Sequence, residues 1–158
     1  KLGQSPDGML EMLHAALSDQ PPGADLCTVC LIVLERGPSH ARLTVTLAGH
    51  PQPLLIGADG IAERLGTPGT LLGVLDPIAV HEVHAELHPG QTLLLYTDGL
   101  PEAGRSSTQL GEQGLLELCA QAPDLTVSGL LEQIERVAIE HADGALRDDI
   151  ALMALRVG

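Results

Sequence analysis

Aromatic residues are almost absent from this 158-residue chain, which has no Trp, no Phe and one Tyr, Tyr96. Without them, there is no platform on which the bases of single-stranded nucleic acid could stack. Lysine is equally scarce, because Lys1 is the only one, and 21 acidic against 8 basic residues give a net charge of −13. A field that attracts phosphate backbones or anionic lipid is therefore missing. We expect neither nucleic acid nor a membrane surface as a partner.

Long apolar runs and cysteines are also few. No segment approaches the roughly 20 consecutive apolar residues of a membrane-spanning helix, and residues 1–13 lack the charged-then-apolar order of a signal peptide. Three cysteines, an odd number, fit reduced thiols better than a disulfide framework. These features predict a cytoplasmic protein. A chain that starts at Lys1 rather than at Met is expected to be part of a longer one.

The hydrophobic pattern predicts one α+β domain over residues 1–158, in which helices cover antiparallel sheet. The expected helices are 6–18, a segment around 115–118, and 127–138; the expected strands are 26–34, 43–47, 53–56, 61–65, 79–87, 91–97 and 149–157. The continuous apolar run 26–34 is typical of a strand buried on both faces, and should form a hairpin with the next strand. Asp59-Gly60 predicts a second hairpin, and the closing strand should insert beside an earlier one.

Two thiols lie two residues apart, at Cys27 and Cys30. Such a pair can form a redox-active disulfide or half of a zinc site. Within a strand, however, the dipole of a helix N-terminus is missing, and Cys119 is the only further thiol. The favoured interpretation is a pair of small, buried apolar side chains.

Three histidines, His81, His84 and His88, would be neighbours on a helix. On the strand expected here, His81 and His84 point to opposite faces. We therefore interpret the group as partly solvated histidines on an exposed sheet edge.

Carboxylates follow or precede two of the expected strands. The apolar stretch 93–97 runs directly into Asp98-Gly99, and Asp148 and Asp149 stand just before the closing strand. Magnesium and manganese prefer oxygen ligands, so aspartates held at rigid strand ends suit these ions. Asp-Gly is also a common turn dipeptide, and an acidic pair is expected by chance among 21 acidic residues. The residues alone leave both interpretations open.

Four motifs occur in a fixed order along the chain: Ala48-Gly49-His50-Pro51-Gln52-Pro53-Leu54, Gly69-Thr70-Leu71-Leu72-Gly73-Val74, Leu95-Tyr96-Thr97-Asp98-Gly99-Leu100-Pro101-Glu102-Ala103 and Arg147-Asp148-Asp149-Ile150-Ala151-Leu152. Together they resemble the metal-dependent protein phosphatase (PPM) family, in its bacterial SpoIIE-like branch, to which RsbU also belongs. The likeness covers nearly the whole chain and about the last two-thirds of the family's domain. Each motif is weak by itself, and their shared order makes the resemblance specific.

The resemblance implies an α-β-β-α sandwich of antiparallel sheets flanked by helices, with two manganese or magnesium ions and hydrolysis of phosphoserine or phosphothreonine on a protein. Asp98 and Asp148 match the family's catalytic metal-ligand positions. Gly99 would let the backbone pass close to the metal site, and Asp149 would support that site through a hydrogen bond. His50 matches a motif position to which we assign a role in shaping a loop.

For the SpoIIE-like branch the resemblance further implies a phosphorylated anti-anti-sigma factor of the STAS type as substrate, in stress or sporulation signalling, and a sensor domain upstream in the same chain. One expected feature is not found, because no Asp-Gly segment on a strand precedes the first helix; Asp7-Gly8 lies within it. The fold is thus expected to be incomplete at the N-terminus. A catalytically incomplete scaffold in the same partner-switching pathway, and an unrelated α+β domain, stay open as alternatives.

Overall fold

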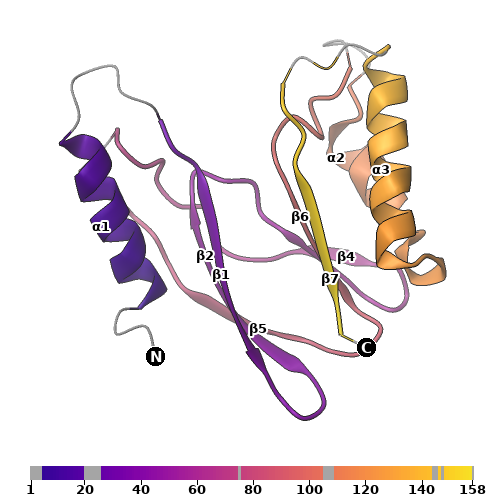
Figure 1. Cartoon of the computed structure of the whole chain (residues 1–158), viewed down its shortest axis with the longest axis horizontal. Coiled ribbons are helices and arrows are strands. Elements are labelled where there is room, and N and C mark those ends of the chain that lie inside the picture. Colours follow the sequence, from indigo (N-terminus) through magenta and orange to yellow (C-terminus); the bar gives the residue numbers. More distant parts are fainter. Residues whose placement is uncertain are drawn as a thin grey trace. The chain divides into compact units, whose positions relative to one another are not determined.

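A computed structural model describes residues 5–19, 26–74, 76–104, 109–143, 146 and 148–157 (Figure 1). The chain divides into two compact units. Unit one comprises Lys1–Gln52 and Leu65–Glu86, and unit two comprises Pro53–Arg64 and Leu87–Gly158. The segment that carries the strand-end aspartates Asp98 and Asp148 thus lies wholly in unit two.

Unit one pairs a helix with a three-stranded sheet. Helix α1 (Pro6–Ser18) begins with proline in its first turn, where the missing N–H costs nothing, and buries Leu10 and His14. Strands β1 (Val29–Arg36), β2 (Ala41–Ala48) and β5 (Val83–Leu87) lie in the order β1-β2-β5. Strands β1 and β2 form an antiparallel hairpin, which confirms the first hairpin predicted from the sequence.

Strand β1 is not buried on both faces, so that prediction is wrong. It is an edge strand, half-buried over its first four residues and exposed over its last four. Val29 and Leu31 near its start pack against the cluster of Leu10, Ala48 and Leu72, and this cover ends further along the strand. The buried strand is the central β2, since an apolar run in the sequence cannot distinguish a central from an edge position.

Unit two contains a four-stranded antiparallel sheet covered by helices. Its strands are β3 (Leu54–Ile56), β4 (Ala62–Arg64), β6 (Thr92–Tyr96) and β7 (Leu152–Arg156), in the order β4-β3-β6-β7. The predicted β3–β4 hairpin is confirmed, with Gly60 at φ +80° in its turn. The closing strand pairs with β6, which confirms its insertion beside an earlier strand.

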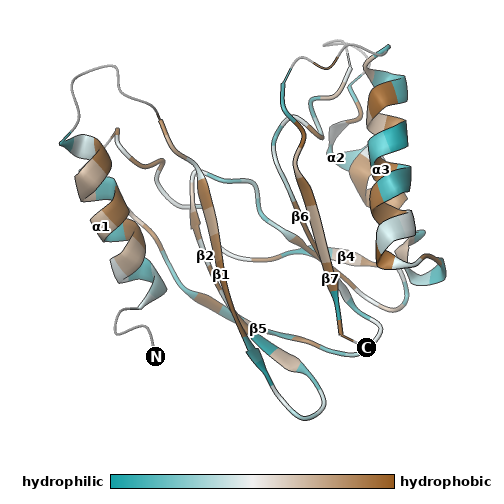
Figure 2. Cartoon of the chain, in the orientation of Figure 1, coloured by the Kyte–Doolittle hydropathy of each residue, from teal (hydrophilic) through white to brown (hydrophobic). Residues whose placement is uncertain are grey.

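Helices α2 (Gly111–Cys119) and α3 (Val127–His141), with the short 3-10 helix η1 (Ala122–Asp124) between them, share the core of unit two with the strands β3 and β6. The Thr126 side chain caps α3 by accepting a hydrogen bond from the Gly129 N–H. Leu130, Ile134 and Ala138 recur at helical spacing and are fully buried. Figure 2 shows that α3 carries both hydrophobic and hydrophilic residues. Among the described residues, no helix is long and apolar enough to cross a membrane.

Arg156 joins the last strand to the helical layer of unit two. Its Nε donates to Thr92 Oγ1, and its two terminal nitrogens donate to the carbonyl oxygens of Leu125 and Ala122, each at 2.8 Å. We expect Arg156→Met to lower the free energy of unfolding by about 2–3 kcal/mol, because half-buried carbonyls lose charged donors. Urea unfolding of the chain measures this.

The matched control is Arg136→Met, because Arg136 makes an exposed ion pair with Glu140 one helical turn away. Such a pair contributes about 0.3–0.5 kcal/mol. Equal losses in the two variants would show that the three bonds of Arg156 stabilise the fold no more than one exposed ion pair does.

Candidate active site

Asp98 and Asp148 lie at the same end of the unit-two sheet. Strand β6 ends at Tyr96, which stands opposite Leu152, the first residue of β7. Because the two strands are antiparallel, the segment that follows β6 and the segment that precedes β7 leave the sheet at one edge. Asp98 and Asp148 occupy these two segments, and both are exposed.

Thr97 fastens the two segments together. Its backbone N–H donates to the Ala151 carbonyl at 3.2 Å. Its hydroxyl oxygen donates to the Asp149 carbonyl and accepts from the Ala151 N–H, both at 2.9 Å. One side chain therefore spans the gap between the strand ends and fixes the backbone beside both aspartates.

Gly99 makes the closest approach between the segments. A Cβ atom at this position would lie 2.6 Å from the Asp149 carbonyl oxygen and 3.4 Å from the Asp148 carbonyl carbon. The first distance is shorter than any van der Waals contact, so only glycine allows the two backbones to pack as they do. Gly99 itself is buried, whereas the aspartates around it face solvent.

Each of the two carboxylates is oriented by the backbone that follows it. Asp98 Oδ1 accepts from the Gly99 N–H at 3.1 Å, and Asp148 Oδ1 accepts from the Asp149 N–H at 2.8 Å. Asp149 is also exposed, and its contact with the other segment is made by its backbone carbonyl, which accepts from the Thr97 hydroxyl. Carboxylate oxygens are the ligands that manganese and magnesium prefer, and the assignment of Asp98 and Asp148 as metal ligands stays a prediction.

His50 belongs to unit one. It is half-buried, and its Nδ1 donates to the Pro51 carbonyl at 3.0 Å, a bond within its own loop. This contact is what a residue that shapes a loop would make. The role assigned to His50 from the sequence stays a prediction.

The thiols of Cys30 and Cys119 are poor nucleophiles. Cys30 lies in β1 and Cys119 is buried in α2, while Cys27 forms an isolated bridge with Leu72. Burial raises the pKa of Cys30 to about 11 and that of Cys119 to about 12. A thiol with a pKa near 11 is roughly one part in a thousand ionised at pH 8, and the thiolate is the reactive form.

We therefore expect iodoacetamide to modify Cys30 at pH 8 roughly a hundredfold more slowly in the folded chain than in urea, as followed by mass spectrometry. Because the folded pKa lies above the ordinary 9.0, burial of the thiol contributes stability below pH 9 that is lost as the pH rises through about 11. Equal rates in folded and unfolded chains would contradict the burial of Cys30.

The exposure predicted for three histidines is confirmed, and one of them, His84, lies in the edge strand β5, while His81 and His88 lie just outside it. His81, His84 and His88 are exposed, and β5 is an edge strand of its sheet. His84 Nδ1 lies 3.1 Å from Thr44 Oγ1.

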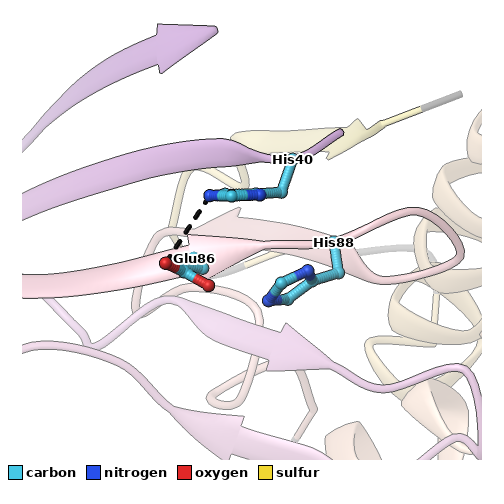
Figure 3. A group of neighbouring side chains, drawn as sticks. All are labelled: His40, Glu86 and His88. Carbon is cyan, nitrogen blue, oxygen red and sulfur yellow. Dashed lines mark ion pairs between the residues drawn. The ribbon is translucent and has the colours of Figure 1, made fainter. Parts of the chain in front are cut away.

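Sequence reasoning missed an ion pair in unit one, between His40 Nε2 and Glu86 Oε1 at 3.5 Å (Figure 3). No sequence signal connects these residues, which come together only through the sheet. Figure 3 also draws His88, the second residue after Glu86. The boundary between the units falls between Glu86 and His88, so within unit one we describe the His40–Glu86 pair alone.

Comparison with known proteins identifies the family. The sequence matches the family described as "Stage II sporulation protein E (SpoIIE)" over residues 1–158, the whole chain. The chain belongs to the SpoIIE family. The resemblance found in the four sequence motifs is thereby confirmed, and the SpoIIE family is homologous to PP2C-type serine/threonine phosphatase domains.

Protein IcfG of Synechocystis is 31% identical over 120 residues, which cover 74% of this chain. The chain spans about a fifth of the length of that curated relative, 19%. The solved PP2C phosphatase domain of SpoIIE from Bacillus subtilis, with a fragment of its regulatory domain, matches with a TM-score of 0.75 at 16% identity, covering 98% of this chain and 45% of that one. The RsbU and RsbW domains of a Mycobacterium tuberculosis protein match with a TM-score of 0.69 at 24% identity, covering 96% and 42%.

These solved structures share the fold of this SpoIIE-family chain. Its two antiparallel sheets with flanking helices are those of the PP2C phosphatase fold, so the predicted α+β fold class is confirmed.

Proposed function

We propose that this chain is a metal-dependent serine/threonine protein phosphatase domain, in which Asp98 and Asp148 are the metal ligands. One observation carries the proposal: the ends of β6 and β7 bring these two exposed carboxylates to one sheet edge, where Thr97 and Gly99 hold the two backbones together. Membership of the SpoIIE family and the PP2C fold support it.

In this proposal Asp98 and Asp148 would hold manganese or magnesium through their carboxylate oxygens. Two such ions would supply an acidified water and offset the charge on the phosphoryl oxygens. The protein's own part is to keep its ligands fixed. Thr97 and Gly99 keep the two backbones in register, and the Asp149 carboxylate would support a ligand through a hydrogen bond. His50 would shape its loop.

As substrate we propose a phosphorylated anti-anti-sigma factor of the STAS type in the bacterial cytoplasm, within a partner-switching pathway of stress or sporulation signalling. A relative with RsbU and RsbW domains supports this class of pathway. The net charge of −13 disfavours long-range attraction of an acidic partner, so recognition would rest on local contacts. We also propose that residues 1–158 act as one phosphatase domain beneath an upstream sensor domain.

Phosphate release from phosphoserine and phosphothreonine peptides tests the proposal. The natural full-length protein is assayed with manganese, with magnesium and with a chelator, beside an Asp98→Asn variant. The proposal predicts release that needs metal and disappears in the variant. Absence of release, together with retained binding of a phosphorylated STAS protein, would instead favour a scaffold in the same pathway.

A further inference from the structure

One sequence motif has no part in the proposed reaction, the segment 69–74 with the sequence Gly-Thr-Leu-Leu-Gly-Val. In unit one, it is tied to the sheet and to the chain before β1. The Gly69 carbonyl accepts from the Gly49 N–H at 3.0 Å, and the Leu72 N–H donates to the Cys27 carbonyl at 3.1 Å. The segment therefore connects the end of β2 to the start of the hairpin.

Helix α1 reaches the same segment through one buried histidine. His14 is 7% exposed, and its Nδ1 accepts from the Gly73 N–H at 3.1 Å. The opposite ring nitrogen, Nε2, lies 3.3 Å from Ser18 Oγ. A backbone N–H can only donate, so Nδ1 must be without a proton and the single proton of the neutral ring sits on Nε2, directed at Ser18. The bond to Gly73 exists only for the uncharged ring.

Beside the ring is a pocket of about 410 Å³. Besides His14 it is lined by Ser18 and by the titratable groups Glu11 and Asp19 on the α1 side and Asp76 on the segment that follows Gly73. The ring thus lies between the Gly73 N–H and this acidic pocket.

We infer that His14 is a proton-sensitive latch between α1 and the segment 69–74. Histidine changes charge between about pH 5 and pH 8. When Nδ1 takes up a proton it presents an N–H to the Gly73 N–H, and that hydrogen bond is lost. The bonds of Gly69 and Leu72 use backbone groups alone, so they persist. Acidification therefore releases Gly73 from α1 and leaves the backbone bonds of Gly69 and Leu72 in place.

Amide hydrogen exchange tests this latch independently of any phosphatase activity. Protection factors at Gly73 and Leu72, each referred to the intrinsic exchange rate at the same pH, are compared at pH 8.0 and pH 5.5. The wild-type chain should lose about tenfold protection at Gly73 on acidification, and none at Leu72. Unchanged protection at Gly73, or an equal loss at Leu72, would overturn the inference.

His14→Asn provides the matched variant, because its side-chain oxygen can accept from Gly73 at both pH values. Its protection at Gly73 should not depend on pH, whereas His84→Asn on the exposed edge strand should behave as wild type. Nitrogen chemical shifts of the His14 ring keep the test independent of how these variants fold. At pH 8.0 Nδ1 should be unprotonated and Nε2 protonated, and the reverse tautomer would contradict the latch.

Discussion

Asp98→Asn and Asp148→Asn should each lower metal-dependent phosphatase activity of the natural full-length protein by at least about a hundredfold. The amide keeps the size of the side chain and one oxygen, but it removes the negative charge that a divalent cation needs. In both variants the oxygen can still accept the backbone N–H that the carboxylate accepts now, from Gly99 or from Asp149. Unfolding free energies should therefore stay within about 0.5 kcal/mol of wild type.

A control aspartate separates this effect from general loss of charge. Asp124 is exposed in unit two, in η1, whose neighbour Leu125 is bonded to Arg156 at the end of β7 opposite to Leu152. Asp124→Asn removes the same charge and should keep wild-type activity. Full activity in both Asp98→Asn and Asp148→Asn would end the assignment of these residues as ligands.

Gly99→Ala should damage both stability and activity. The new methyl group would lie 2.6 Å from the Asp149 carbonyl oxygen, and a backbone carbonyl cannot turn aside as a flexible side chain can. The strand ends must separate, at a cost of about 1–3 kcal/mol in the free energy of unfolding. A displacement near 1 Å at a reactive centre can cost a hundredfold in rate, so we expect a loss of that order in kcat.

Gly129→Ala controls for the effect of adding a methyl group to a glycine. Gly129 lies in α3, where the nearest atom to an added Cβ is Thr126 Oγ1 at 3.2 Å. The better helix propensity of alanine offsets this mild crowding, and stability should change little. If urea unfolding and kcat of Gly99→Ala match those of Gly129→Ala, the close approach at Gly99 does not position the site.

Local patterns predicted most of the fold. The proline and apolar stripe of α1 predicted its range, 6–18, and Asp59-Gly60 predicted the β3–β4 turn. The edge position of β1 could not be predicted, because an apolar run does not record how many strands flank it. Burial along that strand depends on how far the cover by α1 and Leu72 extends over it, which is a property of the tertiary structure.

Local patterns likewise indicated some residues of the candidate site and not others. Asp98 and Asp148 could be predicted from their places beside apolar strands, and the order of four motifs made the metal hypothesis specific. The hydroxyl of Thr97, which joins the two segments, gave no signal, since a threonine at a strand end is unremarkable until its partner strand is known. His14 was equally hidden, because its bond to Gly73 spans 59 positions of the chain.

Binding of manganese by the natural full-length protein tests the central assignment most directly, because it does not depend on the substrate. Free manganese is followed by electron paramagnetic resonance during titration of wild type, Asp98→Asn, Asp148→Asn and the Asp124→Asn control. We predict saturable binding in wild type and control, weakened at least tenfold in each of the other two variants. Equal affinity in all four proteins would contradict a metal site at the ends of β6 and β7.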